Sequence, residues 1–73
     1  MSDVFLPADI DMRVKKARYR AGLTQKALSE KSGLTIEAIS RIENNRNAGP
    51  PRLSTLRKIA DATGVPVTTF TEV

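Results

Sequence analysis

Apolar residues recur along this chain at the three- and four-residue spacing of a helix, and residues that cap or break helices divide the pattern into five segments. The first apolar stripe consists of Ile10, Val14, Ala17 and Ala21. Asp9 stands where an aspartate can cap this helix, and Gly22 stands where a glycine can end it. The spacing therefore predicts a first helix between these two residues.

The next two segments each begin with a threonine and are separated by a glycine. Thr24 is expected to cap a second helix, which Gly33 ends in the left-handed conformation that glycine tolerates. Thr35 is expected to cap a third helix over residues 35–44. The core positions of these two helices are Ala27, Leu28, Ile39 and Ile42.

The prolines of the segment 45–51 prevent the third helix from continuing. A fourth helix is expected over about residues 53–63, with Gly64 after it. A last short turn around residues 67–72 is expected to insert Phe70 into the core. No alternating run is long enough for a sheet. The pattern therefore predicts an all-α fold, a compact five-helix domain.

The organisation that we expect is an N-terminal arm over residues 1–8 and one helical domain over residues 9–73. The arm contains Val4, Phe5 and Leu6, which are apolar for a chain end. Three interpretations remain for them: they cover the core, they pack against a partner chain, or they are disordered.

Only Gly33 and Leu34 separate the second predicted helix from the third. Two helices joined by so short a turn, with glycine at its start, must cross steeply. That is the helix-turn-helix arrangement, whose second helix enters the major groove in DNA-binding proteins.

The charges are unevenly distributed. All twelve Lys and Arg residues lie between Arg13 and Lys58 together with only three acids, so this span carries a net charge of +9 within a chain of +4. A basic middle is typical of a protein that binds a polyanion. It is equally typical of a solvated surface, so the composition alone leaves both interpretations open.

The 73-residue chain contains neither cysteine nor histidine. This excludes disulfides, thiolate metal sites and nucleophile–histidine pairs, and the remaining acids and serines form no catalytic constellation. We therefore expect no enzyme, no metal and no cofactor. No apolar run is long enough to span a bilayer, and the acidic start is unlike a signal peptide, so we expect a cytoplasmic protein without a membrane partner.

The run GLTQKALSEKSGLTIEAISRIENNR, followed by PPRLSTLRKIADATGVP, resembles the Cro/C1-type (XRE) helix-turn-helix domains, which include the lambdoid phage repressors. The resemblance covers about residues 13–70. It implies a lambda-repressor-like DNA-binding domain, most often a repressor-type transcription regulator, with double-stranded DNA as partner. Three departures stand out: Asn45 where glycine is usual, Arg52 where a Ser or Thr cap is common, and residues 1–7, which have no counterpart.

The outer face of the third helix carries Ile36, Glu37, Ser40, Arg41 and Asn44. Arginine can bridge guanine O6 and N7, glutamate can accept from cytosine N4, and isoleucine can pack on a thymine methyl. We therefore expect Ile36, Glu37, Ser40 and Arg41 to read bases. The alternative is a purely structural face, in which Ile36 packs on the turn, Glu37 favours the helix N-terminus and Arg41 is solvated.

Arg18 lies at the rim of the first helix's apolar stripe, and Glu43 lies beside Ile39, turned away from the reading face. The two side chains can meet across the helices at the edge of the core. The resemblance implies a structural ion pair between them.

Five residues are candidates for the DNA backbone. Gln25 lies in the first turn of the second helix, where backbone N–H groups point outward and can donate to a phosphate. The resemblance implies that this glutamine contacts a phosphate. Asn44, Asn45 and Arg46 end the reading helix and begin a loop that would face the sugar–phosphate chain. Arg52 resembles an arginine that approaches the minor groove in some phage repressors. Two interpretations remain for it: insertion into the minor groove, or a contact with a phosphate.

The resemblance also implies pairing of two copies on a two-fold site. We expect a weak homodimer completed on DNA, with Val67, Phe70 and Val73 at its interface. An alternative function is an antitoxin or accessory module, whose main partner is a protein.

Overall fold

The computed structural model describes residues 6–44 and 49–72, and within these ranges it contains five helices and no strand. The helices are α1 (Ile10–Arg20), α2 (Gln25–Ser32), α3 (Ile36–Asn44), α4 (Leu53–Thr63) and α5 (Thr68–Thr71). The expected all-α five-helix fold is confirmed. Of the predicted residues, Val4, Phe5, Asn45, Arg46 and Val73 lie outside the described ranges.

Threonine side chains begin the two central helices as predicted. The Oγ1 of Thr24 accepts a hydrogen bond from the backbone N–H of Ala27 at 3.0 Å, and the Oγ1 of Thr35 accepts one from Ala38 at 3.0 Å. Gly33 ends α2 with a φ of 78°, which a residue with a Cβ adopts only at a cost. The two helices are therefore delimited by local chemistry that the sequence already displays.

The start of α1 differs from the prediction. Asp9 precedes the helix but its side chain caps no backbone N–H, since its φ of −99° and ψ of 30° lie outside the extended region that a capping residue adopts. Its Oδ1 instead accepts from the Nε of Arg13 one turn later, at 3.0 Å. Ala21, predicted on the apolar stripe, follows the last turn of α1 and is exposed.

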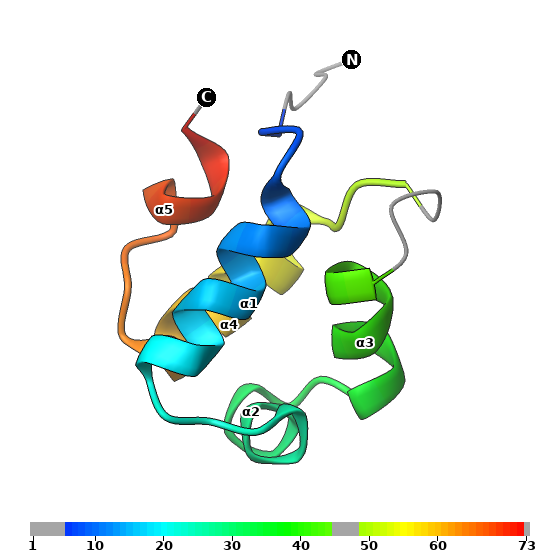
Figure 1. Ribbon diagram of the computed structural model, residues 1–73, viewed down its shortest axis with the longest axis vertical. Helices are drawn as coiled ribbons and strands as arrows, with labels where there is room; N and C mark the ends of the chain where they lie inside the picture. The colour runs from blue at the N-terminus through cyan, green and yellow to red at the C-terminus, as the bar shows by residue number, and fades with distance from the viewer. Residues whose placement is uncertain (1–5, 45–48, 73) are drawn as a thin grey trace.

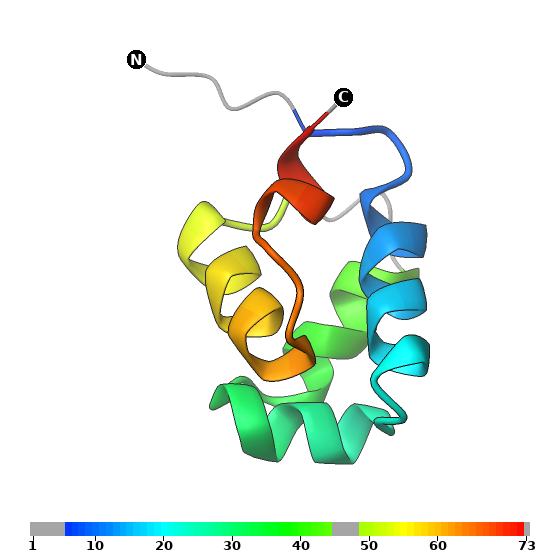
Figure 2. The ribbon, with the colours of Figure 1, turned by 90° about the vertical axis from the view of Figure 1, so that its left-hand side faces the viewer.

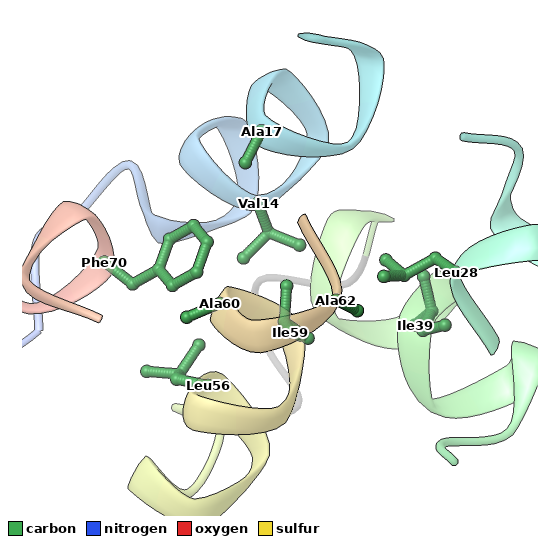
Figure 3. Packing of buried hydrophobic residues seen from close by; sticks show 9 residues of the cluster. All are labelled: Val14, Ala17, Leu28, Ile39, Leu56, Ile59, Ala60, Ala62 and Phe70. Carbon is green, nitrogen blue, oxygen red and sulfur yellow. The ribbon is translucent and has the colours of Figure 1, made fainter. Parts of the chain in front are cut away.

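The core lies between α1 and α4, closed by α5 at one end and by α2 and α3 at the other (Figures 1 and 3). Its fully buried large side chains come from all five helices: Val14, Leu28, Ile39, Leu56, Ile59 and Phe70. Leu6, which precedes α1, is partly buried against this cluster. The interior is therefore assembled from short helices that each contribute one or two large side chains.

Helix α5 is attached to α1 by a charged side chain. The Nη1 of Arg13 donates to the backbone carbonyls of Thr69, at 3.2 Å, and of Glu72. These carbonyls lie in α5 and directly after it, where helical acceptors lack an intrahelical partner. Figure 2 shows α5 at the end of the molecule where α1 and α4 both begin. The guanidinium of Arg13 is thus engaged within the fold.

The position of Phe70 corrects the predicted dimer interface. Its ring is fully buried in the chain's own core, pointing between α1 and α4 (Figure 3). A side chain in this position has no surface to offer a partner chain. Val67 is half-buried and packs against the same core.

Because Phe70 fills the core, we expect Phe70→Ala to lower the free energy of unfolding by about 3–5 kcal/mol through lost burial and the cavity left behind. Urea denaturation followed by circular dichroism measures this. Met12, which is 51% exposed on α1, supplies the control, since Met12→Ala should stay within about 0.5 kcal/mol of the parent. Equal midpoints for the two variants would contradict the packing.

Candidate nucleic-acid interface

The turn between α2 and α3 is held by the side chains that flank it. The Oγ of Ser29 donates to the carbonyl of Leu34, and the backbone N–H of Leu34 donates to the Oγ of Ser32 at 3.2 Å. Leu34 itself packs against the core. With Gly33 in the left-handed conformation, these contacts fix the angle at which α3 leaves α2, as Figure 1 shows.

Helix α3 has a buried face and an outer face. Ile39 and Glu43 are buried, whereas Ile36 is 41% exposed and Glu37 and Arg41 are exposed. The amphipathic arrangement follows from the helical period, since residues three and four apart share a face. The outer face is therefore available to a ligand along the whole length of the helix.

The structure gathers six of the predicted site residues around one shallow surface recess. One of them comes from the start of α2 and the other five from α3. They are Gln25, Ile36, Glu37, Ser40, Arg41 and Asn44. An open surface that combines a carboxylate, a guanidinium, amides, a hydroxyl and an aliphatic group is chemically varied enough to distinguish the edges of different base pairs.

Within the recess, Asn44 is bonded to its neighbour one turn earlier. Its Nδ2 donates to the Oγ of Ser40 at 3.2 Å. This bond fills one acceptor position of the hydroxyl, so the hydroxyl proton of Ser40 points elsewhere and can donate. This hydrogen bond restricts the orientations of the Asn44 amide and the Ser40 hydroxyl on α3.

Arg18 and Glu43 form a bidentate ion pair between α1 and α3. The distances are 2.8 Å from Nε to Oε2 and 2.9 Å from Nη2 to Oε1, and both residues are buried. The hydrogen bond to Glu43 raises the pKa of Arg18 above its usual value, although burial opposes this shift. The guanidinium carbon also lies 4.7 Å from the ring centroid of Tyr19. The two short, parallel hydrogen bonds make this a charge-assisted bidentate contact.

Two further contacts extend this pair in directions that the helical period alone does not indicate. The Nη1 of Arg18 donates to the carbonyl of Leu23 at 2.9 Å, and the Nε2 of Gln25 donates to the Oε1 of Glu43 at 3.2 Å. A helical wheel treats each helix separately, so it gives no sign that a residue of α2 reaches the pair.

Arg52 stands at a second hollow beside the first. The lining consists of Ala38, Arg41, Ile42, Gly49, Pro50, Pro51, Arg52 and Thr55. Arg52 directly precedes α4 and is exposed, and its guanidinium, which has no acceptor, does not cap the helix. Since Arg41 lines both hollows, the two arginines flank a continuous surface. Asn45 and Arg46 lie outside the described residues.

Residues 6–44 and 49–72 contain neither a group of metal ligands nor a membrane-spanning helix. No group of three or more His, Cys, Asp or Glu residues that could hold a metal ion occurs there. In the same ranges no helix is both long and apolar enough to cross a membrane.

Comparison with known proteins identifies relatives of the matched region. A family model described as helix-turn-helix matches residues 14–70. The HTH-type transcriptional regulators PuuR of Escherichia coli (strain K12) and of Shigella flexneri are each 38% identical to this chain over 58 residues. The match covers 80% of this chain and 30% of each relative, so the chain spans less than a third of their length.

Because the carboxylate of Glu43 is fully buried, Glu43→Ala leaves the Arg18 guanidinium desolvated without its partner. We expect a loss of about 3 kcal/mol in the free energy of unfolding, a large fraction of the total for a small domain. Thermal denaturation measures it. Glu30→Ala, which removes the same charge from an exposed position of α2, should shift stability by less than about 0.5 kcal/mol. A melting temperature that is the same in both variants would refute the energetic role of the pair.

Proposed function

This chain belongs to the Cro/C1-type (XRE) helix-turn-helix family, and on that premise we propose that it is a sequence-specific, double-stranded DNA-binding transcriptional regulator of the repressor type. The observation that carries the proposal is the recess on α3, where predicted reading residues and predicted backbone contacts share one open surface. In this arrangement α3 enters the major groove and α2 lies across the backbone.

The reading residues are Ile36, Glu37, Ser40 and Arg41. Arg41 has the donors to bridge O6 and N7 of guanine, and Glu37 accepts from the amino group of cytosine. Ile36, which is exposed at the start of α3, contacts a thymine methyl. Ser40 donates to a base acceptor, because its oxygen already accepts from Asn44.

The backbone contacts surround this helix. The first turn of α2 directs backbone N–H groups outward beside Gln25, an arrangement that favours a phosphate. Asn44 is the last residue of α3, and Arg52 lines the neighbouring hollow, where we propose a contact to a phosphate or to the adjacent minor groove. Asn45 and Arg46, which follow α3 in the sequence, complete the proposed set. Such contacts hold the protein on DNA without selecting a sequence.

We propose that two copies bind one two-fold site. A single α3 reads only part of one groove face, and half-sites one helical turn apart are separated by about 34 Å. The domain measures 33 × 23 × 19 Å, so two copies fit side by side at this spacing. Of the predicted interface residues, Val67 and Val73 remain in the proposal, whereas Phe70 is withdrawn because it is buried.

A protein-binding role as antitoxin or accessory module has less support. Such a module requires no DNA-compatible surface, and a blocked or charge-reversed outer face would favour it. Here Arg41 and Arg52 are exposed and Gln25 lines the recess. We therefore propose DNA as the main partner, no catalytic activity, no cofactor and a location in the cytoplasm, where bacterial DNA lies.

The proposed reading is tested by comparing two variants on two kinds of DNA. Arg41→Ala should cost about 1–3 kcal/mol on a site selected from a random pool and relax the preference at one base pair. Gln25→Ala should weaken binding to selected and random duplexes alike. Fluorescence anisotropy titrations measure both. If Arg41→Ala loses the same affinity on both duplexes, Arg41 does not recognise a base.

Pairing on DNA is tested by the stoichiometry of the complex. On a selected palindromic duplex we expect two chains to bind cooperatively, because the second copy meets both DNA and the first copy at a raised local concentration. Analytical ultracentrifugation at saturation gives the ratio, and a duplex with one half-site scrambled is the control. One chain per intact palindrome would rule out the two-fold arrangement.

A further inference from the structure

One polar chain connects the core to the proposed DNA surface. It runs from the carbonyl of Leu23 through the guanidinium of Arg18 and the carboxylate of Glu43 to the side-chain amide of Gln25. Its links join α1, the α1–α2 turn, α3 and α2. The chain therefore ends on a residue that lines the recess, although it begins inside the fold.

The two ends of the Glu43–Gln25 bond have different surroundings. The Glu43 side chain has no exposed surface, so it cannot contact DNA directly. Gln25 is half-buried and forms part of the recess lining. A glutamine amide carries two N–H donors. One of them is used at 3.2 Å on Glu43, which leaves the second for a ligand.

The Oε1 atom of Glu43 receives two donors, the Nη2 of Arg18 at 2.9 Å and the Nε2 of Gln25 at 3.2 Å. Ile36, the recess neighbour of Gln25 at the start of α3, has an aliphatic side chain and offers no hydrogen bond. Glu43 is thus the side-chain partner that orients this amide.

We propose that Glu43 is a positioning residue of the DNA interface: its buried carboxylate holds the Gln25 amide ready for a backbone phosphate. A long polar side chain that is ordered before binding loses less conformational freedom on binding. The carboxylate itself would repel a phosphate, but Arg18 neutralises it and burial keeps it away from DNA. The ion pair therefore contributes to affinity separately from its contribution to stability.

This inference rests on the proposed function, and a double-mutant cycle separates the two. The variants are Glu43→Met, which keeps the side-chain length but removes both acceptor oxygens, Gln25→Ala, and the two combined. The probe is a mixed-sequence duplex about two helical turns long, titrated at low salt and at a temperature where circular dichroism shows every variant folded. Glu30→Gln on the exposed side of α2 controls for the change in net charge.

We expect Gln25→Ala to weaken binding by up to about tenfold, the size of one hydrogen bond to a charged group. Glu43→Met should weaken it comparably, and the double variant should bind no worse than Gln25→Ala alone. Glu30→Gln should show only the small change that its charge produces. The positioning role is overturned if the two losses multiply in the double variant, or if folded Glu43→Met binds like the parent. A parent chain that binds no duplex overturns the proposed function, and this inference with it.

A measurement on the parent protein keeps the proposal falsifiable if Glu43→Met does not fold. Gln25 is the single glutamine of the chain, so its side-chain ¹⁵NH₂ signals are identified once their coupling to the side-chain carbons separates them from those of the asparagines. We expect restricted motion of the amide and slow solvent exchange of one proton in the free protein, with the other proton shifting when duplex is added. An amide that moves and exchanges like that of free glutamine overturns the proposal.

Discussion

The bidentate contact between Arg18 and Glu43 is the constraint on which the rest of the structure depends. Two hydrogen bonds in one plane fix both the separation of α1 and α3 and their relative rotation. Helix α3 must be placed accurately, because its outer face is the proposed reading surface. Packing of aliphatic side chains would tolerate small rotations at similar energy, whereas a fork-shaped ion pair does not.

A buried pair of this kind adds little stability compared with a well-packed apolar replacement, yet the loss of one partner is costly. What an apolar replacement could not supply is the further hydrogen bonds that the two charged groups make outside the pair. The guanidinium also bonds the turn before α2, and the carboxylate also accepts from the first residue of α2. An apolar pair could stabilise the contact between α1 and α3 to a similar extent, but it would leave the carbonyl of Leu23 and the amide of Gln25 without these partners.

Local chemistry made most of the fold predictable, and the failures have physical reasons. Thr24, Gly33 and Thr35 act on their own neighbours, so their roles are visible in the sequence. Asp9 was wrongly assigned as a cap because the pattern does not show that Arg13, one turn away, competes for its carboxylate.

Contacts between distant segments were harder to predict than local ones. Phe70 was expected both in the core and at a dimer interface, because a helix of four residues is too short for its pattern to separate an inward from an outward apolar residue. Its full burial confirms the first expectation and contradicts the second. The link from Gln25 to Glu43 depends on the angle between two helices, which no single-helix pattern contains. Sequence reasoning therefore found the members of the proposed interface more readily than the bonds that organise them.

The late position of Phe70 has a consequence for synthesis. During translation Phe70, the largest fully buried side chain of the described residues, emerges after the other residues of the core. Until then α1 and α4 lack this side chain between them, and the carbonyls that Arg13 binds have not been synthesised. A nascent chain that has reached only the end of α4 therefore contains α3 but lacks the contacts through which α5 completes the core.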